Sequence, residues 1–456
     1  MSRPVRAREP HKAEHRPLFD CIALLLQGGG ALGAYQAGVY EALAEADLRP
    51  DWVAGTSIGA INSAIIAGTT REERVGKLRE FWELVSRSPF GFDTDFAHLL
   101  SGGDAARSFA RQTSAVTATV VGVPGFYVPR IPGTLLQPPS TLEAMSFYDT
   151  TLLKTTLERL VDFDLINSKG HDVRLSLGTV NVQSGQLVYF DSTTDIIRVE
   201  HVMASGALMP WFPAVEIDGE YYWDGGIVSN TPLEWLARQR LPNTLAFQVD
   251  LWAAPGELPK NLPDLLTRMK EILNSSRTIY RTQGYKEINH LYATLFRFLD
   301  QVPEEFKRGE DAKYLMSVAR QSVHHLVNLV YRPTRPEGAS KDHEFSRRSW
   351  KTVGSLVIAI RCTRSAILKS LSGPPLATRA FSSLNFPGTK VEGGGHHLPR
   401  HLRGSHPDRR AFVPSPPRRA GDFSRYNGQP NLHAMVTTWP FVVVAAHRGH
   451  PRSSAI

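Results

Sequence analysis

Two short apolar runs near the N-terminus each end in a glycine-rich turn, and this arrangement constrains the fold more than any other feature of the sequence. The first run, residues 21–26, is followed by glycines at 28, 29, 30 and 33; the second, residues 52–54, leads into Gly-Thr-Ser-Ile-Gly at 55–59. Continuous apolar runs of this kind are typical of strands buried on both faces of a parallel sheet. A helical pattern follows each turn, so the sequence predicts an α/β fold with a mainly parallel sheet.

The first turn matches G-x-G-x-x-G at Gly28, Gly30 and Gly33, which is also the fingerprint of dinucleotide-binding folds. That interpretation requires an acidic residue at the end of the second strand, where it would bind a ribose hydroxyl. Asp51 instead precedes the second apolar run, so dinucleotide binding is the weaker interpretation. The turn still predicts backbone N–H groups that can bind an anion at a helix N-terminus.

The second turn places Ser57 between Gly55 and Gly59, where the predicted strand meets the predicted helix. This is the context in which G-x-S-x-G forms a nucleophile elbow. A sharp turn at the serine exposes Oγ and brings the flanking backbone so close that a side chain at either glycine would clash. The alternative is an ordinary turn whose small residues only allow close packing.

A serine hydroxyl is a weak nucleophile until a nearby base takes its proton. Seven of the 16 histidines follow residue 350, and the others, such as His201, are interpreted as surface or hydrogen-bonded core histidines. The best candidate base is Asp224, which follows the aromatic residues 221–223 and precedes two glycines. The alternative is a common Asp-Gly turn, which we predict six residues earlier at Asp218, between two strands of a hairpin.

In this order and spacing, residues 28–33, 55–59 and 224–226 resemble the motifs of the patatin-like phospholipases. That family combines a glycine-rich loop, a G-x-S-x-G elbow and a distant D-G-G or D-G-A. Residues 204–210, Ala-Ser-Gly-Ala-Leu-Met-Pro, also resemble the segment that precedes the acid in this family. The resemblance covers roughly residues 20–255, and residues 340–346 resemble the extension of a bacterial subgroup.

The resemblance implies a three-layer α/β/α domain and a Ser–Asp dyad that needs no histidine, no metal and no other cofactor. Ser57 would be the nucleophile, Asp224 the proton acceptor, and the glycine loop the oxyanion hole. The residues that this resemblance assigns to the oxyanion hole are Gly28, Gly29 and Gly30. The other glycines of the three motifs are Gly33, Gly55, Gly59, Gly225 and Gly226. The family often has Lys or Arg where this chain has Leu32, which weakens the case for an anionic head group but not for hydrolysis.

The expected function is therefore a serine acyl-ester hydrolase of the lipid acyl hydrolase or phospholipase A type. The alternatives are a hydrolase of another oxyester such as a storage polyester, a non-catalytic lipid-binding α/β protein, and a nucleotide-binding oxidoreductase. We expect a lipid or other acyl ester as the substrate and no nucleic-acid partner. Contact with a membrane surface is left open.

Charge is distributed unevenly along the chain. Residues 351–456 hold 15 of the 52 Lys and Arg but only 3 of the 44 Asp and Glu, so the net charge of +8 comes from this tail. The first 350 residues are slightly acidic, which argues against nucleic-acid binding on the basis of charge. Only two cysteines, no secretory signal and no apolar run of about 18 residues are found, so we expect a cytoplasmic protein.

Four regions are predicted: a basic flexible N-terminus (1–18), a catalytic domain (19–255), a mainly helical extension (256–350) and a basic tail of low order (351–456). The tail is either an arm that binds anionic lipid or a non-functional sequence. Proline-broken residues 116–140 form either a cap over an acyl pocket or a packed surface loop. In the helical part, 262–331, the residues expected on buried faces are Met269, Ile272, Leu295, Phe296, Leu299, Leu315 and Val318.

Overall fold

A computed structural model describes residues 19–89, 104–239, 244–319, 324–332, 341–347 and 350. The chain divides into two compact units, Met1–Glu392 and Gly393–Ile456, and all described residues belong to the first. The segments predicted to be flexible or of low order, 1–18 and 351–456, lie outside the described residues.

Within the described residues, the main sheet has eight strands in the order β10-β9-β1-β2-β5-β8-β7, with β6 paired to β5 outside this path. The bonds between β10, β9, β1, β2 and β5 are all parallel, and β6, β7 and β8 are joined by antiparallel bonds. The strands are β1 Cys21–Leu26, β2 Trp52–Thr56, β5 Arg174–Asn181, β6 Leu187–Asp191, β7 Val215–Ile217, β8 Glu220–Asp224, β9 Thr244–Asp250 and β10 His324–Val330; β3 Val128–Pro129 and β4 Tyr148–Asp149 form a separate pair.

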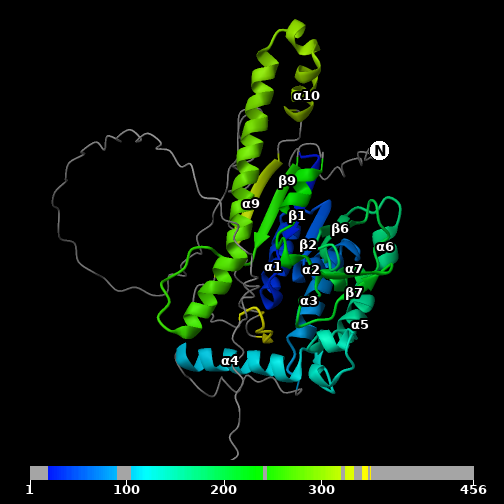
Figure 1. The fold of residues 1–456 in the computed structure, drawn as a ribbon, viewed down its shortest axis with the longest axis vertical. Coiled ribbons are helices and arrows are strands. Elements are labelled where there is room, and N and C mark those ends of the chain that lie inside the picture. The colour runs from blue at the N-terminus through cyan, green and yellow to red at the C-terminus, as the bar shows by residue number, and fades with distance from the viewer. Residues whose placement is uncertain are drawn as a thin grey trace, which may run out of the picture. The chain divides into compact units, whose positions relative to one another are not determined.

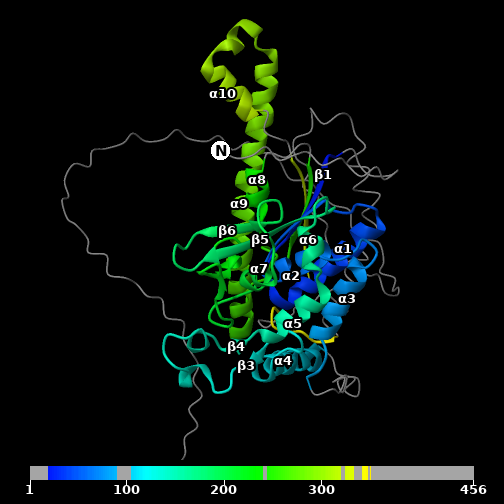
Figure 2. The ribbon, with the colours of Figure 1, turned by 90° about the vertical axis from the view of Figure 1, so that its right-hand side faces the viewer.

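Helices cover both faces of this sheet (Figures 1 and 2). Alternate residues of β1 enter two different apolar clusters: Ile22, Leu24 and Leu26 pack with α1, α2 and α3, whereas Cys21, Ala23 and Leu25 pack with α8 and α9. The predicted three-layer α/β/α fold with a mainly parallel sheet is therefore confirmed. The helices are α1 Ala34–Glu45, α2 Ile58–Ala67, α3 Arg74–Val85, α4 Asp104–Val121, α5 Thr151–Leu160, α6 Phe163–Asn167, α7 Val199–Ser205, α8 Leu233–Arg238, α9 Leu262–Gln301 and α10 Glu310–Ala319.

The helical extension is present, but it also contributes a strand. Residues 324–330, inside a segment predicted to be mainly helical, form β10 and pair with β9 along its whole length. This pairing is a tertiary contact that local periodicity does not encode, which is why the sequence pattern missed it. The extension thus completes the same sheet that carries the predicted catalytic motifs.

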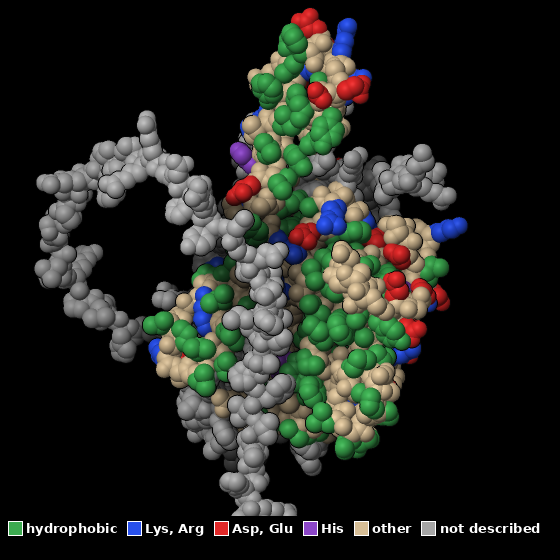
Figure 3. Space-filling model, viewed as in Figure 1, with side chains coloured by type: hydrophobic (Ala, Val, Ile, Leu, Met, Phe, Trp, Pro, Cys, Tyr) green, Lys and Arg blue, Asp and Glu red, His purple; other side chains and the backbone are tan. Residues whose placement is uncertain are grey.

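The buried face of α9 is more polar than predicted. Ile272 and Phe296 on α9 and Leu315 on α10 are 47%, 46% and 40% exposed, although Leu299 is buried as expected. The buried side of α9 instead carries Tyr285 and small polar residues, because these meet two glutamines: Gln27, just after β1, donates from Nε2 to Thr278 Oγ1 at 2.9 Å, and Gln248 on β9 donates from Nε2 to Thr282 Oγ1 at 3.3 Å. Figure 3 shows apolar side chains on the exposed sides of α9 and α10.

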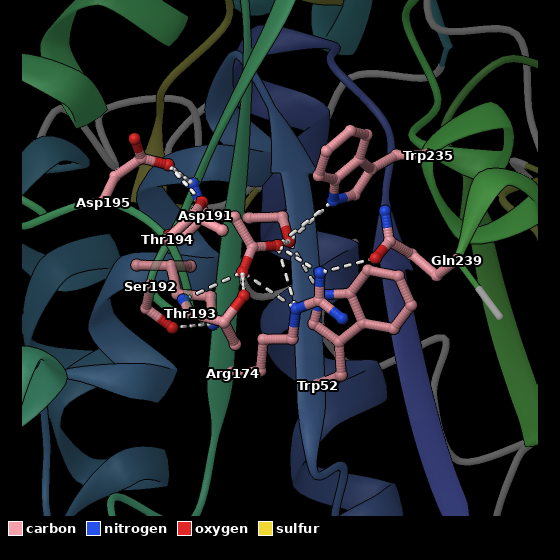
Figure 4. Close-up of polar contacts among 11 residues, drawn as sticks. Trp52, Arg174, Asp191, Ser192, Thr193, Thr194, Asp195, Trp235 and Gln239 are labelled. Atoms are coloured by element: carbon pink, nitrogen blue, oxygen red, sulfur yellow. Dashed lines mark hydrogen bonds and ion pairs between the residues drawn. The ribbon is translucent and has the colours of Figure 1, made fainter. Parts of the chain in front are cut away.

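A buried ion pair stabilises the sheet near the start of β5 (Figure 4). Arg174 Nε donates to both carboxylate oxygens of Asp191 at 2.9 Å, and its guanidinium lies 4.4 Å from the ring centroid of Trp52. Burial alone would raise the pKa of Asp191, but the hydrogen bonds and charge of Arg174 outweigh burial and hold that pKa below its usual value. Ser176 and Trp235 also donate to Asp191, so the network is satisfied internally and we assign it a structural role.

The tight turn predicted at Asp218 is present in the structure. The hairpin of β7 and β8 turns at Asp218 and Gly219, both with positive φ (52° and 86°), as expected for a tight Asp-Gly turn. No helix in the described part of the chain has the length and hydropathy needed to cross a membrane.

Candidate active site

Ser57 lies in a strained turn between β2 and α2. Its backbone has φ 59° and ψ −127°, a conformation that residues other than glycine rarely adopt. A Cβ at Gly55 would lie 2.2 Å from the carbonyl oxygen of Gly59, and a Cβ at Gly59 would lie 2.2 Å from that of Leu26. The expected reason for both glycines, close approach of the flanking backbone, is confirmed.

A second serine supports this turn. The backbone N–H of Ser57 donates to both the carbonyl oxygen and Oγ of Ser205, at 3.1 and 3.2 Å. Ser205 Oγ in turn donates to the carbonyl oxygen of Gly178 on β5 at 2.6 Å. Ser205 belongs to residues 204–210, so this family-like segment contacts the turn directly and fixes its position against the sheet.

Strand pairing brings Ser57 and Asp224 together. Along one edge of β5, β2 runs parallel and ends with Thr56 beside Gly178, while β8 runs antiparallel and ends with Asp224 beside Thr179. The two strands therefore run toward each other and end at consecutive positions of β5, the other edge of which is occupied by β6. The Ser57 side chain lies close enough to the Asp224 carboxyl group to lower its pKa.

Asp224 is fully buried, and burial determines its acidity. Only 1% of the residue is exposed, and burial raises the pKa of its carboxyl group to about 6, although the nearby Ser57 side chain and the Gly226 N–H lower it. The Gly226 N–H donates to Asp224 Oδ1 at 2.7 Å. Such a carboxylate is still ionised at neutral pH and is a stronger base than an ordinary aspartate, which suits proton transfer from a hydroxyl group.

The glycine loop lies against Ser57 and is tied to the segment that follows Asp224. A Cβ at Gly28 would lie 2.9 Å from Ser57 Cβ and 2.2 Å from Asn230 Oδ1. Asn230 holds Gly28 from both sides: its carbonyl oxygen accepts the Gly28 N–H at 3.1 Å, and its Nδ2 donates to the Gly28 carbonyl oxygen at 2.9 Å. The Gly28 N–H, one of three expected oxyanion donors, is therefore already engaged.

The other two expected donors, Gly29 and Gly30, differ from Gly28. Among the described residues, the N–H groups of Gly29 and Gly30 have no acceptor, whereas those of Ala31 and Leu32 donate to the carbonyl oxygens of Asp342 and Gly29. The N-terminus of α2 also begins directly after Ser57 and favours negative charge there. The loop and helix can thus bind an anion formed next to the serine.

Sequence reasoning did not identify Asn230, Ser205 or Asp342 as parts of this site. Asn230 had one local signal, its place six residues after Asp224 in the segment that begins with Gly225. Ser205 was recognised only as one residue of the segment 204–210, which resembles the segment that precedes the acid in the patatin-like phospholipases. Asp342 carried no signal from its residue type, because it contacts the loop through its backbone carbonyl.

Other candidate chemistries find less support at this site. Asp51, which a dinucleotide site would need near the loop, precedes β2 and accepts the Ile22 N–H at 2.8 Å at the opposite end of the strands. His201 accepts the Arg198 N–H through Nδ1 at 2.8 Å, which fits the expected structural role. No group of three His, Cys, Asp or Glu within the described ranges could hold a metal ion.

Two family models match separate parts of the chain. A family model described as "Patatin-like phospholipase" matches residues 24–237, and another described as "Patatin phospholipase" matches residues 272–353. The chain is 49% identical over 55 residues to a patatin-like phospholipase domain-containing protein of Pyricularia oryzae, and 46% identical over 57 residues to lysophospholipase nte1 of Aspergillus terreus.

These relatives are much longer than the matched segments. Each match covers 12% of this chain but only 7% of the Pyricularia protein and 4% of the Aspergillus protein. Among solved structures, VipD from Legionella pneumophila is 16% identical, and the match covers 74% of this chain and 67% of VipD with a TM-score of 0.29.

Proposed function

Since the chain belongs to the patatin-like phospholipase family, we propose that it is a serine hydrolase of lipid acyl esters that uses Ser57 and Asp224 as a catalytic dyad. The observation that carries this proposal is the proximity of the Ser57 side chain to the buried carboxyl group of Asp224, at the facing ends of β2 and β8. The activity would be of the phospholipase A or lysophospholipase type.

The reaction would proceed through an acyl-enzyme. Ser57 Oγ attacks the ester carbonyl carbon while Asp224 accepts the hydroxyl proton, and the resulting oxyanion binds the free N–H groups of Gly29 and Gly30. The carbon–oxygen bond to the leaving alcohol then breaks, and Asp224 returns the proton to that alcohol. Water hydrolyses the acyl-enzyme by the same steps, with Asp224 again as the base.

Exposed apolar residues of the proline-broken segment 116–140 support a lipid as the substrate. Ile131 and Leu135, in the proline-broken segment, are 94% and 96% exposed. β3 of this segment pairs with β4, and the Tyr148 N–H of β4 donates to the carbonyl oxygen of Trp211 at 2.9 Å. Trp211 is itself partly exposed. We propose that this surface meets acyl chains or a membrane surface during catalysis.

Turnover of a substrate panel tests the proposal. Purified protein should hydrolyse a nitrophenyl acyl ester and at least one of phosphatidylcholine and lysophosphatidylcholine, and Ser57→Ala should lose all of these activities. Ser184→Ala, at an exposed serine on the turn between β5 and β6, is the matched control and should retain them. A wild-type protein without turnover on any of these esters would refute the proposed function.

A further inference from the structure

A short segment of the extension, residues 341–345, lies directly on the glycine loop. The carbonyl oxygen of Asp342 accepts the Ala31 N–H at 3.0 Å. Gly30 has φ 55°, and a Cβ at this position would lie 2.2 Å from the same oxygen. The backbone of Asp342 therefore occupies the space beside Gly30, and only glycine fits there with this conformation.

The same segment is fastened to α9 by two ion pairs. Lys270 Nζ donates to both carboxylate oxygens of Asp342 at 2.9 and 3.0 Å, and Lys341 Nζ donates to Glu271 Oε1 at 2.7 Å. Two consecutive residues of α9 thus hold two consecutive residues of the segment, each pair with opposite charges. The side chains of Lys341 and Glu271 are only 6% and 19% exposed, so this pair is shielded from water more than a surface ion pair, whereas Asp342 is 17% and Lys270 36% exposed.

Lys341 also reaches the other end of the glycine loop through a tryptophan. Its Nζ lies 5.3 Å from the ring centroid of Trp252, within the range of a cation–π contact. Trp252 Nε1 donates to the carbonyl oxygen of Gly28 at 3.1 Å. One end of the loop is therefore fixed through Trp252 and the other through Asp342.

We propose that residues 341–345 are a positioning element for the oxyanion-binding loop, and this inference rests on the proposed hydrolase function. The two free donors, Gly29 and Gly30, lie between the anchored residues Gly28 and Ala31. Glycines are conformationally permissive, so a loop of this composition needs external contacts to hold its N–H groups in one orientation. Donors held in place before the reaction stabilise an oxyanion without the cost of reorganisation. None of the extension residues has to touch the substrate.

The test measures catalysis and loop protection in the same variants. In Lys341→Met and Asp342→Asn, kcat for a nitrophenyl ester should fall about 10-fold while KM stays within about 2-fold, because only stabilisation of the transition state is lost. The Ala31 amide should exchange its hydrogen faster in both variants. The double variant Lys270→Glu with Asp342→Lys should regain part of the kcat that is lost in Asp342→Asn, because it forms an ion pair of reversed polarity at the same place.

Lys313→Met is the matched control. Lys313 also forms an ion pair, with Glu310 at 2.8 Å, but its side chain is 61% exposed on α10. This variant should leave kcat and Ala31 exchange unchanged. Unchanged kcat in both Lys341→Met and Asp342→Asn, with or without faster Ala31 exchange, would overturn the positioning role while leaving the hydrolase function intact. An inactive wild-type protein would instead overturn the proposed function itself, and Ala31 exchange would then report only on the contact.

Discussion

Ser57 and Asp224 meet because the strands that carry them run toward each other along one edge of β5 and end beside Gly178 and Thr179. Gly225 permits this close arrangement, since a Cβ there would lie 2.5 Å from the carbonyl oxygen of Gly178. The hydroxyl and the carboxyl group are thus positioned by sheet hydrogen bonds rather than by mobile loops.

Activity should depend on pH through Asp224. Burial raises the pKa of this carboxyl group to about 6, and only the ionised form can accept the Ser57 proton. Turnover should therefore be constant above about pH 7 and fall by about tenfold per unit below pH 6. The measurement is a pH profile of kcat/KM on an ester that does not ionise. A midpoint near pH 4, where an ordinary aspartate titrates, would contradict this assignment.

The dyad should behave as a single unit. Ser57→Ala should abolish ester turnover, and Asp224→Asn should be nearly as damaging because the amide cannot accept the proton. The double variant should be no slower than the worse single variant, since losses within one catalytic unit are not additive. Residual kcat values of the three variants provide the comparison. A double variant slower by the product of both single effects would show that the residues act independently.

Asn230 should matter for catalysis through the glycine loop. Asn230→Ala removes the Nδ2 donor to the Gly28 carbonyl oxygen, so kcat should fall about 10-fold while the fold is retained. Asn167→Ala is the control: its Nδ2 donates to the carbonyl oxygens of Phe163 and Ile197, away from the loop. The control should lose stability but keep its kcat. Equal kcat values for the two variants would remove Asn230 from the site.

The buried pair Arg174–Asp191 should affect stability and not chemistry. Asp191→Ala leaves a guanidinium that is only 10% exposed without its carboxylate, which should lower the free energy of unfolding by about 3–5 kcal/mol. Urea unfolding at pH 7 measures this, and kcat of the folded variant should be unchanged. Since the pKa of Asp191 is lowered in the folded state, its contribution is present above the unfolded pKa and is lost as pH falls through the folded pKa. A loss below about 1 kcal/mol, as for an exposed pair, would contradict the structural role.

The part of the fold that could be predicted is the part encoded locally. The apolar run that forms β1, the glycine turns and the hairpin turn at Asp218 each carry their signal within a few residues. The candidate nucleophile and base were likewise visible as Ser57 in its elbow and Asp224 before two glycines. Their proximity could not be derived from local pattern, because it depends on where β2 and β8 end along β5.

The contacts that sequence analysis missed are all long-range. Ile272 and Phe296 of α9 are exposed to solvent. The opposite face of the helix carries polar residues such as Thr278, whose hydroxyl accepts a hydrogen bond from Gln27 Nε2. β10 exists only through its pairing with β9. Asp342 acts through a backbone carbonyl, which every residue type has. Periodicity and motif spacing carry no information about such partners.

Labelling with a fluorophosphonate probe, followed by mass-spectrometric mapping of the modified residue, tests the central claim most directly. The probe reacts with serines that are activated as nucleophiles, so we predict a single adduct on Ser57 in the wild-type protein. Labelling should vanish in Ser57→Ala and be strongly slowed in Asp224→Asn, while Ser184→Ala labels at the wild-type rate. An adduct on another residue, or undiminished labelling of Asp224→Asn, would contradict the Ser57–Asp224 dyad.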